Sequence, residues 1–196
     1  KRQILYKYVL YCSHRRRKPR EGSMLILYGS KYGTAKRYAE EFAKLAGCEA
    51  AESRGRREAA AGDTVVLFGA VYAGAVRGLK AAARCAERCG GTLAVVTVGL
   101  TDPQDAENNR ATEKGVRASL PARLRGGVRF FHLRGGIDYG RLSFGHRLLM
   151  KLMYSAEKRI PEEKRSAQGR AIIQTYGSKA DFTDLSALQG IAEALR

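Results

Sequence analysis

A loop of small and hydroxyl-bearing residues follows the apolar run Leu25–Tyr28. The loop consists of Ser30, Lys31, Tyr32, Gly33, Thr34 and Ala35. Its backbone N–H groups can turn toward a phosphate, and the helical pattern that begins at its end adds about half a positive charge. Ser30 and Thr34 offer hydroxyl donors, and Gly33 permits positive φ. The loop is a candidate phosphate site, with an ordinary strand-to-helix turn as the alternative.

Two later loops carry the other candidate ligand contacts. They span residues 69–76 and 99–103, each directly after an apolar strand. In a doubly wound sheet both loops emerge beside the first, at the edge where ligands bind. A flat aromatic ligand needs apolar walls and a few polar groups, and Tyr72 is a candidate wall unless it is a surface tyrosine. The further candidate contacts are Val71, Ala73, Gly74, Gly99, Leu100 and Thr101.

The elements that must position these loops alternate along the chain. Strands are expected at 25–28, 48–53, 64–68, 92–98 and 128–133, and helices at 34–46, 76–89, from about 104 to 123, and 184–195, the last capped by Thr183 or Asp184. Strands alternating with helices of this length predict βαβ units and a parallel sheet covered on both faces. The fold class is therefore α/β with a doubly wound five-stranded sheet.

A helical insertion is expected after the fifth strand. Residues 135–140 are predicted as a loop, and 141–160 as an amphipathic helix that Pro161 limits. Its apolar side either packs on the sheet and the pocket or lies on a membrane surface. Four basic residues are candidate contacts for anionic substrate groups or lipid head groups, with a solvated face as the alternative: Arg134, Arg141, Arg147 and Lys151.

The chain is strongly basic, with 36 Lys and Arg against 19 Asp and Glu and a net charge of +17. Residues 1–23 hold eight of these basic residues and one Glu, which leaves +10 on residues 24–196. The field favours anionic partners, although solubility alone is an alternative explanation. Residues 1–23 read as a basic extension, either non-native because translation starts at Met24, or a basic arm for a membrane or nucleic acid.

Other kinds of site have little support in the sequence. The four cysteines are Cys12, Cys48, Cys85 and Cys89, and without a C-x-x-C pair they are interpreted as small buried thiols, so no metal site is expected. No apolar run approaches the roughly 20 residues of a membrane span. No acid–base constellation is identified, and His132 and His146 are interpreted as structural or surface residues. A cytoplasmic location is expected.

The segment Met24–Phe42 resembles the first strand, phosphate loop and first helix of the flavodoxin superfamily. The family pattern is S/T-x-x-G-x-T, which Ser30 and Gly33 match, while Ala35 replaces the second Thr. The resemblance implies the strand order 2-1-3-4-5 and FMN as cofactor, with its phosphate at the Ser30–Ala35 loop and its ring at the two later loops.

The segment Phe131–Met153 resembles the flavodoxin-like branch that contains menaquinone-dependent protoporphyrinogen IX dehydrogenase, and so does the later Asp181–Asp184. The resemblance implies an oxidoreductase of heme biosynthesis that passes electrons from a reduced substrate through FMN to a quinone or another redox partner, with peripheral contact to the inner face of an anionic membrane. A flavodoxin-type electron carrier is the alternative, which the basic charge disfavours. A nucleic-acid-binding module has no RRM, KH or helix-turn-helix pattern to support it, so no nucleic-acid partner is expected.

Overall fold

Five parallel strands form the centre of the molecule. The computed structural model describes residues 23–55, 57–72 and 74–196, so Ala73 and the N-terminal extension up to residue 22 lie outside the described residues. The strands are β1 (Met24–Gly29), β2 (Ala50–Glu52), β3 (Thr64–Tyr72), β5 (Thr92–Gly99) and β6 (Arg129–Arg134). They pair in the order β2-β1-β3-β5-β6, and every pair is parallel. Counted along the chain this is the order 2-1-3-4-5, which confirms the prediction.

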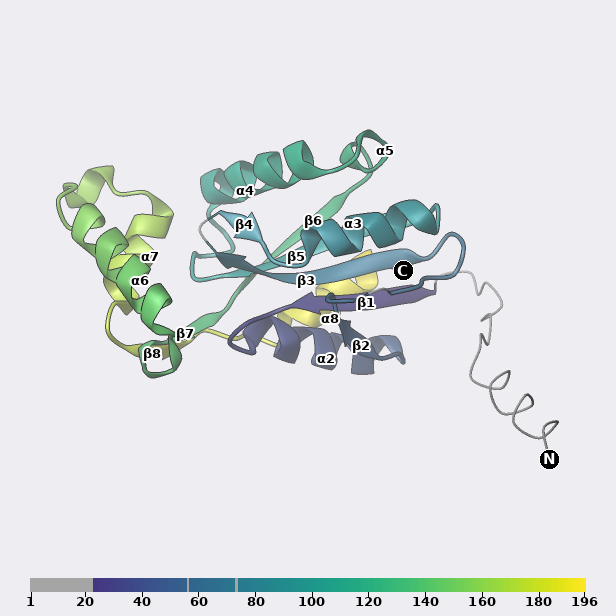
Figure 1. Cartoon of the computed structure of the whole chain (residues 1–196), viewed down its shortest axis with the longest axis horizontal. Coiled ribbons are helices and arrows are strands. Elements are labelled where there is room, and N and C mark those ends of the chain that lie inside the picture. Colours follow the sequence, from purple (N-terminus) through teal and green to yellow (C-terminus); the bar gives the residue numbers. More distant parts are fainter. Residues whose placement is uncertain (1–22, 56, 73) are drawn as a thin grey trace, which may run out of the picture.

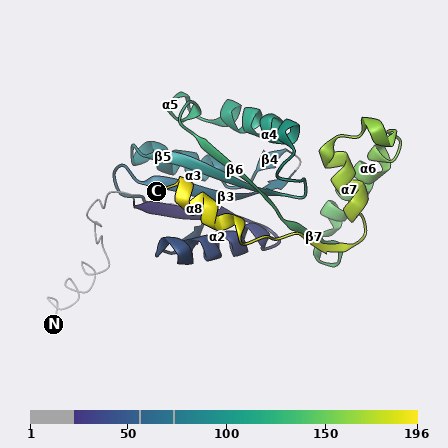
Figure 2. The same cartoon turned by 180° about the vertical axis from the view of Figure 1, so that it is seen from behind.

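Helical layers cover both faces of the sheet (Figures 1 and 2). One layer holds α2 (Thr34–Ala46) and α8 (Ala187–Ala194), and the other holds α3 (Leu79–Arg88), α4 (Ala106–Ser119) and α5 (Ala122–Arg125). Because successive strand residues point to opposite faces, Val66 and Phe68 pack in the core of the first layer, while Val65 and Leu67 pack in that of the second. Strands buried on both faces explain the near-continuous apolar runs of the sequence.

The end of β3 differs from the sequence-based expectation. A loop is predicted over 69–76, but β3 continues to Tyr72 and pairs antiparallel with β4 (Ala75–Val76). Helix α3 therefore begins at Leu79, after Gly78 in the left-handed region, and not at Val76. The chain passes very close to the strand ends here, since a Cβ on Gly29 would lie 2.1 Å from the carbonyl oxygen of Arg77. This crossing depends on contacts across the sheet, which a local pattern does not reveal.

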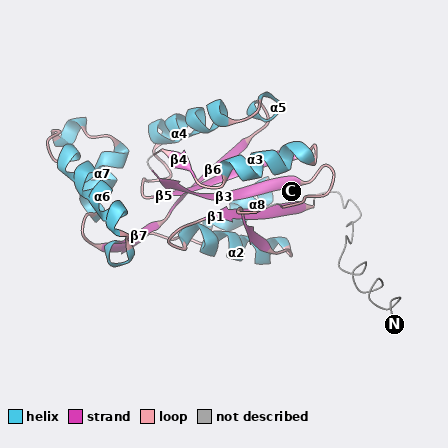
Figure 3. Cartoon of the chain, viewed as in Figure 1, coloured by secondary structure: helices cyan, strands magenta, loops and turns pink. Residues whose placement is uncertain are grey.

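The segment between β6 and α8 forms a helical insertion at the carboxyl end of the sheet (Figure 3). Its elements are β7 (Gly136–Asp138), the 3₁₀ helix η1 (Tyr139–Arg141), α6 (Phe144–Glu157), the 3₁₀ helix η2 (Glu162–Lys164), α7 (Ala167–Thr175) and β8 (Lys179–Asp181). The insertion itself is as predicted, but the loop over 135–140 contains β7, and α6 is shorter than 141–160. Helix α7 is absent from the prediction. Strand β8 is absent too, because β7 and β8 are three-residue strands that pair across a long separation in the sequence.

Tyr38 ties the insertion to the sheet and to the last helix. Its buried hydroxyl donates to the carbonyl oxygen of Arg134 at 2.8 Å and accepts from the N–H of Asp184 at 2.8 Å. The predicted cap of the last helix is wrong by two residues or more, because the N-cap is Ser186. Asp184 instead accepts hydrogen bonds from the N–H and hydroxyl of Ser186, and so shapes the turn before α8.

Candidate functional site

The loop between β1 and α2 has the backbone geometry of an anion site. Gly33, the N-cap of α2, has φ +101°, and its N–H donates to the Ser30 hydroxyl oxygen at 3.0 Å. The first intrahelical bond at this end runs from Arg37 N–H to the Gly33 carbonyl at 2.9 Å. In a helix the N–H groups before that bond have no intrahelical partner. Those of Thr34, Ala35 and Lys36 therefore remain for an anion at the positive end of the helix.

Three rings from three elements meet beside this loop. The centroid of Tyr32 lies 6.3 Å from that of Tyr72 at the end of β3 and 5.6 Å from that of His146 in α6. The Tyr32 hydroxyl oxygen is 2.5 Å from Nδ1 of His146 and accepts a long bond from the Ser143 N–H at 3.5 Å. Burial raises the pKa of Tyr72. Burial, followed by the charges of Lys31 and Arg77, lowers the pKa of His146, so this ring is neutral near pH 7.

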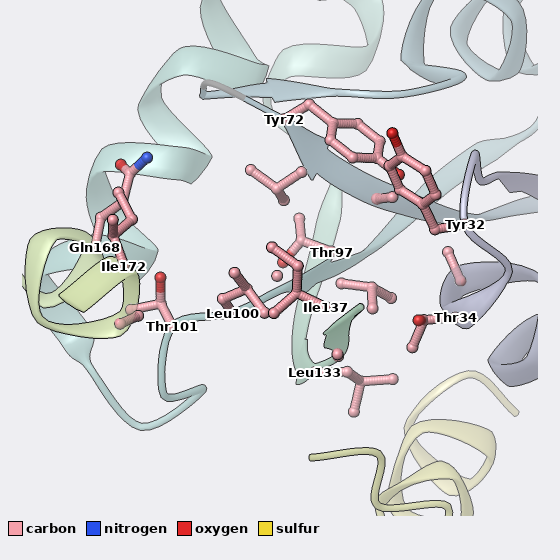
Figure 4. Close-up of a pocket in the computed structure, with 18 of the residues that line it drawn as sticks. Tyr32, Thr34, Tyr72, Thr97, Leu100, Thr101, Leu133, Ile137, Gln168 and Ile172 are labelled. Atoms are coloured by element: carbon pink, nitrogen blue, oxygen red, sulfur yellow. The ribbon is translucent and has the colours of Figure 1, made fainter. Parts of the chain in front are cut away.

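A pocket extends from these rings along the carboxyl edge of the sheet to the insertion (Figure 4). The predicted cofactor residues that line it are Ser30, Tyr32, Thr34, Ala35, Val71, Tyr72, Gly74, Gly99, Leu100 and Thr101. Lys31 and Gly33 belong to the same loop but do not line the pocket, and Ala73 lies outside the described residues. The three predicted loops therefore surround one cavity.

The insertion supplies the wall of the pocket opposite the sheet. Leu149, Met150 and Met153 of α6 line it together with Ala171 and Ile172 of α7. Figure 4 shows Ile172 and Gln168 at the end of the pocket far from Tyr32 and Tyr72. Apolar walls with a few polar groups suit a flat, largely apolar ligand. The helical insertion thus adds an apolar wall to what would be an open edge of the sheet.

The opposite face of α6 is exposed and apolar. Phe144 is 83% exposed and Leu152 61%, and Leu148 lies between them on the helix at 48%. Lys151 is exposed beside them. Leu149 lines the pocket and is itself 43% exposed, so the apolar surface of α6 runs from the pocket wall to solvent.

The four predicted basic contacts do not line the pocket. The Arg134 guanidinium donates to the Leu100 carbonyl at 3.0 Å and lies 3.8 Å from the ring centroid of Phe182. Arg147 donates to the carbonyl oxygens of Tyr139 and Gly140, and Arg141 and Lys151 are exposed. These four cations lie outside the pocket, and Arg134 fixes the loop after β5.

A polar chain at the base of the pocket is missing from the sequence-based prediction. Thr97 Oγ1 lies 2.7 Å from Nδ1 of His132, and Nε2 of His132 lies 3.2 Å from a carboxylate oxygen of Glu113 in α4. Thr97 and His132 are register partners in β5 and β6, and both line the pocket. The available signal was a polar residue near the carboxyl end of each of two apolar strands. His132 is therefore part of a polar constellation, which the sequence-based interpretation does not include.

A comparison with protein families decides what this site belongs to. The family model described as Flavodoxin domain matches residues 25–164, which covers β1 through η2. The chain belongs to the flavodoxin family. A comparison with curated proteins gives no match. Flavodoxin domains typically hold a flavin and serve redox chemistry, in agreement with a phosphate-type loop beside a partly apolar pocket.

The residues of this flavodoxin domain fit the phosphate of a flavin nucleotide. The fit rests on the amides of the first turn of α2, on Ser30, and on the open space around Gly33, where a Cβ would meet nothing within 4 Å. Ala35 is fully buried and adds no hydroxyl, but the neighbouring Thr34 lines the pocket. In the described part of the chain, no group of three or more His, Cys, Asp or Glu is placed to hold a metal ion.

Proposed function

We propose that this flavodoxin domain is an FMN-dependent oxidoreductase that takes electrons from a reduced substrate and passes them to a quinone. The observation that carries the proposal is the pocket itself. It joins the anion site of the Ser30–Ala35 loop to apolar walls built by α6 and α7. A protein that only carries electrons has no need of an apolar pocket next to its flavin, whereas an enzyme needs one to hold its substrate.

The proposed roles follow from where each residue lies. The first-turn amides of α2, Ser30 and Thr34 hold the phosphate, and Tyr72 and the backbone of Gly99–Thr101 border the ring. When bound, FMN supplies the chemistry of accepting a hydride and releasing electrons. Leu149, Met150 and Met153 offer apolar contacts to the substrate on the side of the pocket away from the sheet.

Protoporphyrinogen IX is the substrate that we propose. The resemblance of Phe131–Met153 to the branch with menaquinone-dependent protoporphyrinogen IX dehydrogenase supports it, as do the apolar pocket walls. The basic residues Arg134, Arg141, Arg147 and Lys151 do not line the pocket, and are then candidate partners for propionate groups that extend out of it. This assignment places the protein in heme biosynthesis.

A quinone acceptor implies contact with a membrane. Within the described residues no helix is long and apolar enough to cross a bilayer. We propose that the exposed face of α6, with Phe144, Leu148 and Leu152, lies on the cytoplasmic surface of an anionic membrane, and that nearby cations such as Lys151 meet lipid head groups.

Two measurements test the proposed function. The purified protein, or the protein reconstituted with FMN, is expected to show a bound-flavin absorption spectrum. Anaerobic mixing with protoporphyrinogen IX should bleach this spectrum, and a menaquinone analogue should restore it. Failure to bind FMN contradicts the proposal as a whole. Bound FMN that neither substrate nor quinone affects supports the electron carrier instead.

A further inference from the structure

Thr97, His132 and Glu113 form a continuous hydrogen-bonded chain from the base of the pocket to the surface. The two contacts are 2.7 Å and 3.2 Å long. Exposure rises along the chain, from 4% for Thr97 through 14% for the His132 side chain to 32% for that of Glu113. The strand register holds Thr97 and His132 side by side, and α4 supplies Glu113. The arrangement thus connects a buried hydroxyl in the pocket with a partly solvated carboxylate.

The chemistry of these groups fixes where the hydrogens lie. An ionised carboxylate only accepts hydrogen bonds, so Nε2 of His132 carries the hydrogen that faces Glu113. In the neutral ring Nδ1 is then an acceptor, and the Thr97 hydroxyl donates to it. The carbonyl oxygen of Phe131 lies 3.4 Å from Thr97 Oγ1 and is a second acceptor for that hydroxyl. If the ring gains a proton, Nδ1 becomes a donor and the Thr97 hydrogen turns toward Phe131.

We propose that Thr97, His132 and Glu113 form a relay that takes up the proton released when a substrate is oxidised in the pocket. The proposal rests on the proposed oxidoreductase function. Among the described residues, the charged group in contact with His132 is Glu113. The guanidinium of Arg134, two residues further along, instead donates to the Leu100 carbonyl and to the Gln174 side chain. The other titratable groups that line the same pocket are Tyr32, Tyr72, Asp102, Asp138 and His146.

The proton balance of the reaction requires such an acceptor. Hydride transfer from a substrate C–H group would carry both electrons of that bond to the flavin. The electron pair of an N–H bond conjugated with that carbon then shifts to complete the new double-bond system, and its proton must leave. Thr97 Oγ1 accepts that proton while its own hydrogen passes to Nδ1 of His132. The resulting imidazolium is stabilised by Glu113, and water at Glu113 takes the released proton.

One test needs no cofactor. Imidazole ¹⁵N spectra of the apo protein, recorded where the ring is neutral, should show His132 with hydrogen on Nε2. Glu113→Gln should raise the share of the Nδ1–H form, because an amide can also donate to the ring. Glu107→Gln, an exposed acidic position on the same helix, is the matched control and should leave the spectrum unchanged. Hydrogen on Nδ1 in the wild-type ring would overturn the relay.

A second test uses the FMN-loaded protein and protoporphyrinogen IX. Thr97→Val keeps the shape of the side chain but removes the hydroxyl, and should slow flavin reduction by roughly 10²-fold, at the lower end of what a positioned proton acceptor contributes. Thr97→Ser should restore the rate to within about threefold of wild type, since it restores the hydroxyl. His132→Gln should also slow flavin reduction, because the side chain no longer offers Nδ1 to take the hydrogen that leaves Thr97 Oγ1. FMN affinity is expected to stay unchanged in all three variants.

The outcomes separate the two proposals. If the wild-type protein does not bind FMN or is not reduced, the proposed function fails and the relay fails with it, and the ¹⁵N spectra then report only on the hydrogen-bonded chain. If the wild-type protein is reduced and Thr97→Val and His132→Gln are reduced at the same rate, only the relay fails. A structural role alone predicts a lower melting temperature with an unchanged rate of flavin reduction in the folded protein, and this result would also contradict the relay.

Discussion

The hydroxyl oxygen of Tyr32 lies 2.5 Å from Nδ1 of His146, so one hydrogen bond joins the phosphate loop to helix α6 of the insertion. The Ser143 N–H faces the same oxygen, which leaves the Tyr32 hydrogen free to point at His146. The two residues are 114 positions apart in the sequence. The contact therefore reports whether the insertion is closed over the pocket.

The first prediction concerns the pH dependence of this closure. The pKa of His146 is lowered by burial and by the charges of Lys31 and Arg77. The released ring takes up a proton near its ordinary pKa of about 6.5, and the packed ring only at lower pH. The packed state is therefore fully favoured above about pH 6.5 and loses stability as the pH falls below it. Trypsin should cleave the insertion faster at pH 5.5 than at pH 7.5.

The variant His146→Phe keeps the ring packing and removes the titration, so its cleavage rate should change less between the two pH values than that of the wild-type protein. The titration midpoint of His146 in an NMR experiment should lie below 6.5. A midpoint at or above this value would contradict the mechanism.

The second prediction concerns Gly33. Its φ is +101°, and a Cβ there meets nothing within 4 Å, so Gly33→Ala adds backbone strain without a clash. This strain is worth about 1–2 kcal/mol. The melting temperature should fall and FMN should bind several-fold more weakly, because the amides of the loop lose their alignment.

Gly115→Ala is the matched control for Gly33→Ala. Gly115 lies inside α4 with equally open space around its Cβ position, and helix propensity favours the change by about 0.5–1 kcal/mol. The control should therefore raise the melting temperature slightly and leave FMN binding unchanged. Equal behaviour of the two variants would contradict a special conformation at Gly33.

The third prediction concerns the buried hydroxyl of Tyr38. Tyr38→Phe leaves the Arg134 carbonyl and the Asp184 N–H without their shared partner, at a cost of about 1–3 kcal/mol for buried polar groups left unpaired. Chemical denaturation should show this loss. Tyr28→Phe is the control, because among the described residues no hydrogen bond involves the Tyr28 hydroxyl, and it should stay within about 0.5 kcal/mol of wild type. Similar losses of unfolding free energy in both variants would contradict the role assigned to the Tyr38 hydroxyl.

The strands of the sheet could be predicted from the sequence, whereas the elements that form the pocket wall could be predicted only in part. The apolar runs that became β3 and β5 are buried on both faces, so their composition alone identifies them. The helix over Thr34–Ala46 has its predicted bounds, because Gly33 and Gly47 both take positive φ at its ends. The prediction for residues 69–78 was wrong because the backbone at Arg77 passes close over Gly29 and Gly69. That contact forms only in the folded sheet, so the local sequence does not reveal it.

The candidate site shows the same division. The Ser30–Ala35 loop is local, and its chemistry follows from residue types and spacing. The contact between Thr97, His132 and Glu113 depends on the register of β5 with β6 and on the rotation of α4, which no local pattern fixes. The split of α6 into a pocket face and an exposed face likewise requires knowing where the sheet lies, although the amphipathic helix itself was predicted.

The fourth prediction uses this split to test membrane contact. Leu148 and Leu152 are exposed and, unlike Leu149 and Met153, do not line the pocket, so they test lipid contact without altering the pocket wall. Leu148→Asp with Leu152→Asp should weaken binding to vesicles that contain phosphatidylglycerol by at least about tenfold, since burial of a leucine contributes roughly 1.5–3 kcal/mol. The control is Leu45→Asp in α2, a leucine that is 49% exposed and lies outside the insertion. FMN binding should survive in both proteins, and equal vesicle binding by both would show that α6 does not dock on lipid.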